Sequence, residues 1–147
     1  MMSNGTSSWC DDFLLGYTPM DDTHREFVDL VHAMRVVSDE VFPALLDRFS
    51  AHAEKHFAEE AEWMAAEDFP ARDCHIEEHD KVLCSLREVQ KMLASGDFEV
   101  GRRFALALEE WFPGHAAYMD SALAQWMVKK QAGGVPLVLK RMKVTAD

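Results

Sequence analysis

The chain has few cysteines, and they do not occur in a pattern that suggests pairing. Cys10, Cys74 and Cys84 are an odd number, and none of them forms a CxxC motif. On a single helix Cys74 and Cys84 would be about 15 Å apart, which is too far for a disulfide. The composition therefore argues against a disulfide framework. We expect Cys74 and Cys84 to be small buried residues.

Basic residues and long apolar runs are also scarce. The 147 residues include 15 Lys and Arg against 26 Asp and Glu, a net charge of −11, and the pI is near 5.0. Nucleic acids and anionic membranes attract clustered basic surfaces, so we expect neither as a partner. No segment approaches the roughly 18 apolar residues of a membrane span. Residues 1–6 lack the layout of a signal peptide, which predicts a cytoplasmic protein.

The size and apolar content predict one domain over residues 1–147. A hydrophobic fraction of 48% is enough for a real core. We expect an N-terminal arm over 1–19, a helical bundle over about 20–131, and a C-terminal tail over 132–147 that covers one end of the bundle. The side chains expected to hold the arm to the core are Trp9, Phe13, Leu14 and Leu15.

Four segments show the apolar periodicity of amphipathic helices, with hydrophobic residues at three- and four-residue steps. They run from about 21 to 37, 43 to 69, 73 to 94 and 98 to 131. Short connections between them favour antiparallel neighbours. The sequence thus predicts an all-α protein, an up-down-up-down four-helix bundle.

Five of the seven histidines and two carboxylates recur on these helices at spacings suited to metal binding. Glu60 follows His56 by four residues, and His79 follows His75 by four, so each pair projects from one helix face. A single pair of this kind often occurs on a helix surface by chance. Here chance would have to produce such a pattern on several successive helices. The predicted ligands are His24, His56, Glu60, His75, His79, His115 and Asp120.

The last two ligands have an unusual spacing. Asp120 lies five residues after His115, about 140° around an ideal helix. The pair reaches one site only if the helix widens locally in a π-like turn or breaks at Pro113-Gly114, where we expect a kink. The sequence therefore predicts an irregular fourth helix.

The number and type of ligands point to two metal ions. Buried carboxylates without a cation cost several kcal/mol each, so a metal is the simpler account. Seven protein ligands exceed the four of a tetrahedral zinc site, whereas two ions that share bridging carboxylates match the count. Imidazole suits zinc, copper, iron and nickel, which leaves the metal open at this point.

Over about residues 9–130 the sequence resembles hemerythrin in its bacterial form. The resemblance implies a non-haem di-iron centre with an oxo or hydroxo bridge, which binds dioxygen reversibly as a carrier, store or sensor rather than as an enzyme. The histidine-rich set favours carriage. A di-iron oxidase, peroxidase or nitric oxide reductase, or a signalling module, stays as the alternative. The residues that carry the resemblance are Met20-Asp21-Asp22-Thr23-His24, His56-Phe57-Ala58-Glu59-Glu60, His75-x3-His79 and Trp111-x3-His115-x4-Asp120.

The resemblance also assigns roles within the ligand set. One iron would take the three histidines His75, His79 and His115, while His24 and His56 would hold the other. Glu60 and Asp120 would bridge the two ions. The iron with two histidines then has an open position for dioxygen.

Apolar residues within a turn of the ligands are candidates for the oxygen pocket, and each has an alternative interpretation as ordinary core packing. Phe112-Pro113-Gly114 and Ala116 depart from the family pattern, in which an unbroken helix with leucine after the tryptophan and a larger aliphatic residue are more common. We interpret His52 as a hydrogen-bonded neighbour of His56 in preference to a ligand. The pocket candidates are Phe27, Phe57, Trp111, Phe112, Ala116 and Met119.

Overall fold

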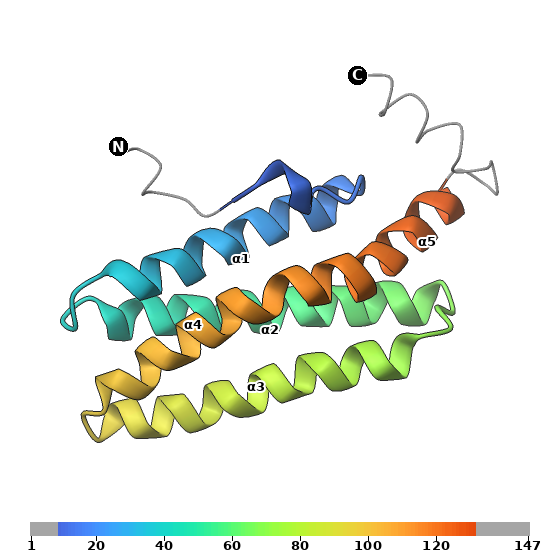
Figure 1. The fold of residues 1–147 in the computed structure, drawn as a ribbon. Helices are drawn as coiled ribbons and strands as arrows, with labels where there is room; N and C mark the ends of the chain where they lie inside the picture. The colour runs from blue at the N-terminus through green and yellow to red at the C-terminus, as the bar shows by residue number, and fades with distance from the viewer. Residues whose placement is uncertain (1–8, 132–147) are drawn as a thin grey trace.

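The structure is a computed structural model that describes residues 9–131, and this part of the chain contains helices and no strand. α1 contacts α2 and α4, and α3 contacts the same two helices, so the four close into a bundle with alternating directions (Figure 1). The predicted all-α four-helix bundle is confirmed. The elements are a short 3-10 helix η2 (Asp11–Phe13), α1 (Thr18–Val36), α2 (Phe42–Ala66), α3 (Arg72–Ala94), α4 (Phe98–His115), a π-helical segment η3 (Ala116–Asp120) and α5 (Ser121–Gln131).

Carboxylates at the starts of α1 and α4 accept hydrogen bonds from nearby backbone N–H groups. The carboxylate of Asp21, in the first turn of α1, accepts hydrogen bonds from the backbone N–H of Leu15 at 2.8 Å and of Gly16 at 3.1 Å. This contact ties the arm to the start of α1. Asp97 caps α4 by accepting a hydrogen bond from the N–H of Val100 at 3.1 Å.

The buried ligands lie between two apolar clusters that divide the core along its length. On α1, Met20 belongs to one cluster and Phe27 to the other, with His24 between them. On α2, Ala53 and Met64 flank the ligands in the same way. The bundle therefore has a polar layer within a dry core, where unpaired polar atoms are costly.

Two predictions about single side chains were wrong. Leu14 is 49% exposed, whereas Trp9 and Phe13 pack against the larger apolar cluster and Leu15 against the smaller one. Cys74 and Cys84 are exposed instead of buried. On α3 the inward face is taken by the histidines, and Cys74 is rotated about 100° from its neighbour His75, toward solvent.

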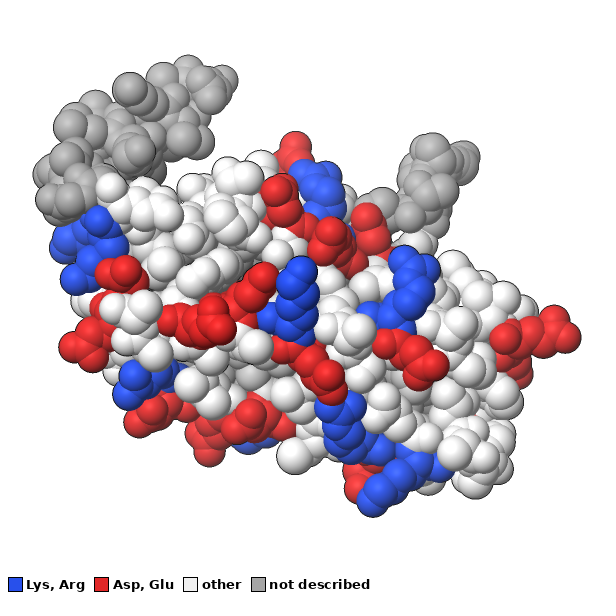
Figure 2. All heavy atoms as spheres, turned by 180° about the vertical axis from the view of Figure 1, so that it is seen from behind, with Lys and Arg blue, Asp and Glu red and all other residues white. Residues whose placement is uncertain are grey.

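The visible surface of the bundle carries charged side chains of both signs. Figure 2 shows Asp and Glu side chains interspersed with Lys and Arg over the visible face of the bundle. None of the described helices is long and apolar enough to cross a membrane. The predicted tail at 132–147 and the start of the arm at 1–8 lie outside the described residues, so the single-domain division stays a prediction.

Candidate metal centre

All seven predicted ligands meet in the polar layer of the bundle. Each of them is at most 6% exposed. They come from every helix of the bundle, so the site exists only when the four helices are assembled. α1 supplies His24, α2 supplies His56 and Glu60, α3 supplies His75 and His79, α4 supplies His115, and η3 supplies Asp120.

One half of the site contains three histidines. The donor atoms of His75, His79 and His115, together with one oxygen each of Glu60 and Asp120, lie within 4.8 Å of one another. The Nε2 atoms of His79 and His115 are 3.1 Å apart, and Asp120 Oδ1 lies 3.2 Å from His115 Nε2. Three imidazole nitrogens and two carboxylate oxygens thus lie close enough together to hold one metal ion.

The other half contains two histidines. His24, His56 and Glu60 form a second group whose donor atoms meet the same 4.8 Å limit. His56 Nε2 is 3.3 Å from Glu60 Oε2, and His24 Nε2 is 3.1 Å from Asp120 Oδ2. This half therefore has one imidazole fewer than its neighbour.

The two carboxylates each present one oxygen to each half. Glu60 Oε1 lies 3.1 and 3.4 Å from the two imidazoles of α3, while Oε2 lies 3.3 Å from His56. Asp120 Oδ1 lies 2.9 Å from His75, while Oδ2 lies 3.1 Å from His24. This is the arrangement that bridging carboxylates require.

The donor atoms fit metal ions better than they fit one another. Both oxygens of Glu60 and Asp120 are fully buried without a hydrogen-bond partner, as is Nε2 of His24 and His75. Several of these atoms lie about 3 Å apart, yet their angles do not make hydrogen bonds. Leaving such groups unpaired costs several kcal/mol. Cations between them would remove that cost, so the residues present match a metal site.

The π-helical segment brings the fourth-helix ligands together. η3 begins directly after His115 and ends on Asp120, and its wider turn brings Oδ1 within 3.2 Å of the imidazole. Of the two predicted irregularities, the π-like turn is confirmed. α4 runs through Pro113 to His115, so the helix does not break at Pro113-Gly114. The kink expected there stays a prediction. The exposed proline ring faces solvent, and buried Phe112 and His115 hold the inner face of the helix in place.

Burial and the carboxylates set the pKa values of the histidines. Burial lowers the pKa of His56 to about 4 and that of His79 to about 3. Burial acts in the same direction on His24 and His75, but their contacts with the two bridging carboxylates outweigh it and raise both pKa values to about 9. Near neutral pH the metal-free protein therefore keeps His56 and His79 neutral, whereas His24 and His75 are protonated.

These pKa values predict a stability maximum near pH 6.5 for the metal-free protein. As the pH rises from 6.5 to 9, the protons on His24 and His75 that stabilise the folded state are lost. As the pH falls from 6.5 to 4, the unfolded chain takes up protons that His56 and His79 resist in the fold. Since one pKa unit corresponds to about 1.4 kcal/mol, we expect a loss of a few kcal/mol on each side. Urea unfolding of chelator-treated protein across this range checks it, and a steady rise in stability toward pH 9 would contradict it.

Glu78, which was not predicted from the sequence, contacts Trp111 and lies beside the predicted ligand His115. Glu78 Oε1 accepts a hydrogen bond from Trp111 Nε1 at 3.1 Å and lies 3.5 Å from His115 Nδ1. The Trp111 ring stacks on His115 with centroids 4.3 Å apart. These contacts orient the imidazole with Nε2 toward the site. In the sequence, the one feature that could have indicated this role of Glu78 is its position directly before the predicted ligand His79.

The structure places four of the six pocket candidates in two separate pairs. Trp111 stacks on His115, and Phe57 stacks on His79 with centroids 3.9 Å apart, so both cover the three-histidine half. Phe112 meets His24 edge-on at 5.2 Å and stacks on Phe27 at 5.3 Å, which places this pair beside the two-histidine half. The remaining two are buried Ala116 and half-buried Met119.

His52 lies beside the site but outside both ligand groups. Its Nδ1 is 3.6 Å from Glu26 Oε1, and its ring stacks on His56 at 5.9 Å. It is therefore placed as a neighbour of a predicted ligand, with its Nδ1 toward Glu26 of α1. Whether it affects the metals stays a prediction.

A helical bundle with a buried imidazole from every helix, together with the carboxylates of α2 and η3, belongs to the class of bundle proteins that bind metal ions in their core. The family model for the hemerythrin HHE cation binding domain matches residues 15–127. The chain is also 42% identical over 122 residues to the bacteriohemerythrin of Ralstonia nicotianae, an alignment that covers 83% of this chain and 89% of that relative. The chain belongs to the hemerythrin family.

Proposed function

We propose that the protein holds two iron ions and binds dioxygen reversibly, as a carrier, store or sensor. The observation that carries the proposal is the division of the ligands into two groups that share both carboxylates. Glu60 and Asp120 each direct one oxygen to the three-histidine half and the other oxygen to the two-histidine half. Two ferrous ions would supply the electrons and the coordination that reversible dioxygen binding needs.

The ligand set favours iron and an asymmetric pair. Mixed imidazole and carboxylate donors suit iron in helical bundles, and seven of them exceed the need of a single zinc ion. His75, His79 and His115 would hold one ion, and His24 and His56 the other. Since the second ion has one protein ligand fewer, an external ligand would bind on the His24 and His56 side.

The surroundings of that side support ligand binding in a dry pocket. Phe27 and Phe112 are 2% and 4% exposed, and the Phe112 ring contacts His24 directly. Aromatic walls exclude water, which would otherwise displace a bound apolar ligand. Of the predicted pocket residues, these two are the ones we retain for the dioxygen side.

Absorption spectra test the proposal directly. Iron-loaded protein, cycled between anaerobic and aerated buffer, should develop charge-transfer bands in air and lose them again on deoxygenation. Elemental analysis of the same sample should show two irons per chain. The matched control is the same protein loaded with zinc, which has no redox chemistry and should show no bands.

Other outcomes would favour a different function. A one-way spectral change would support the alternative of a di-iron oxidase, peroxidase or nitric oxide reductase. One metal ion per chain, or zinc in protein from iron-replete cells, would contradict the di-iron proposal. A cytoplasmic location, and dioxygen as the partner rather than nucleic acid, stay predictions.

A further inference from the structure

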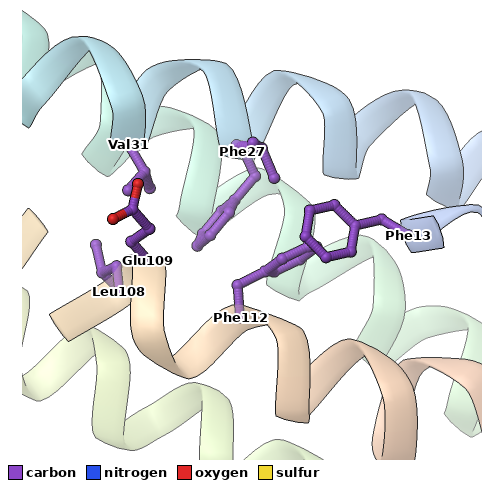
Figure 3. A pocket seen from close by; sticks show the side chains of 7 residues that line it. Phe13, Phe27, Val31, Leu108, Glu109 and Phe112 are labelled. Atoms are coloured by element: carbon purple, nitrogen blue, oxygen red, sulfur yellow. The ribbon is translucent and has the colours of Figure 1, made fainter. Parts of the chain in front are cut away.

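A small cavity lies between α1 and α4, next to the two-histidine half of the metal centre. Its volume is about 50 Å³, enough for one diatomic molecule or one xenon atom. Figure 3 shows Phe13 at one end of the cavity, and Leu108 with Glu109 at the other. The labelled lining residues are Phe13, Phe27, Val31, Leu108, Glu109 and Phe112.

The lining favours an apolar occupant over water. A buried water needs two to four polar partners, and among the lining side chains only Glu109 carries a polar group. That carboxylate is already paired with the guanidinium of Arg35. The remaining walls are hydrocarbon, so a water molecule inside would lose hydrogen bonds, whereas an apolar gas molecule would lose none.

Phe112 forms the wall between the cavity and the metal ligands. Its ring lines the cavity, stacks on Phe27 at 5.3 Å, and touches the edge of the His24 imidazole at 5.2 Å. A rotation of this one ring would join the cavity to the volume beside His24. The cavity is therefore one side chain away from the ion with fewer protein ligands.

Phe13 covers the cavity from the N-terminal arm. Its ring meets Phe112 edge-on at 5.3 Å and Trp9 at 5.5 Å. Within η2, the backbone N–H of Phe13 donates to the carbonyl of Cys10, a bond inside the arm itself. The arm is tied to the bundle further along, where Asp21 accepts from Leu15 and Gly16. Phe13 thus lies on a short segment before α1, and moving this segment away from the cavity would not require α1 to unwind.

We propose that this cavity is a binding site for a small apolar gas molecule, that Phe13 is its cover, and that the site lies on the route to the His24 side of the metal centre. The gas site rests on the size and lining of the cavity alone. Its place on a dioxygen route rests on the proposed function. The two parts therefore have separate tests.

Xenon tests the gas site without any metal chemistry. Crystals of the protein as purified, under xenon pressure, should show an anomalous-scattering peak inside the cavity. Val31→Leu adds a methylene group to the wall and should lower the xenon occupancy several-fold. Val89→Leu is the matched control, because Val89 is buried in the same apolar cluster but does not line the cavity. A parent protein without xenon in the cavity would overturn the gas site.

Stopped-flow kinetics test the route. In reduced, iron-loaded protein, Phe13→Ala should raise the association and dissociation rates of dioxygen several-fold, and Val31→Leu should lower the association rate. Leu14→Ala, next to Phe13 but 49% exposed, is the control and should match the parent. If xenon binds but both variants keep the parent rates, the route is wrong. If no reversible dioxygen binding occurs, the proposed function fails, and the xenon peak still decides the gas site.

Discussion

Replacing Glu60 with alanine is expected to remove both metal ions from the protein. Because Glu60 directs Oε1 to the three-histidine half and Oε2 to the two-histidine half, its loss would take one ligand from each of the two proposed ions. Asp120→Ala should act in the same way, since its two oxygens also face different halves. The expected metal content, measured by elemental analysis after purification from iron-replete cells, falls from two ions per chain to nearly none.

Two comparison variants separate bridging from general damage. His24→Ala removes a ligand from the two-histidine half alone, so about one ion per chain should remain, held by the other group. Glu62→Ala changes the same residue type at an exposed position of the same helix and should leave both ions bound. If Glu60→Ala and His24→Ala retain the same single ion, Glu60 does not bridge.

Removal of the metal ions is expected to lower the melting temperature by more than about 10 °C. A ligand at a thousand times its dissociation constant adds about 4 kcal/mol of stability, and 1 kcal/mol corresponds to roughly 4 °C in a domain of this size. Chelation would also leave the buried oxygens of Glu60 and Asp120 with imidazole contacts alone, which do not have hydrogen-bond geometry, and this adds to the loss. Differential scanning calorimetry of holo and chelator-treated protein measures the difference.

The Glu60→Ala variant provides the control for this experiment. It lacks the ions from the start, so a chelator should not change its melting temperature. Equal melting temperatures for the holo and chelated parent protein would contradict the buried site. A drop in the parent together with no change in the variant would show that the ions stabilise the fold through this site.

The sequence by itself determined the helices and predicted the candidate ligand pairs, because both depend on spacing along one helix. Glu60 four residues after His56, and His79 four after His75, share a helix face whatever the rest of the chain does. The same logic set the apolar stripes that predict the bundle. The five-residue spacing of His115 and Asp120 also showed that the helix must deviate, though it left a π-like turn and a proline break as equal options.

Only the tertiary structure decided the contacts that join different helices, because they depend on how far each helix is rotated and shifted against its neighbours. Glu78 becomes a partner of His115 only when α3 and α4 are packed. Phe57 and Phe112 look alike as aromatic neighbours of ligands, yet packing puts them over different halves of the site. The cavity under Phe13 likewise forms from residues far apart in the chain, and periodicity along one helix carries no information about such distances.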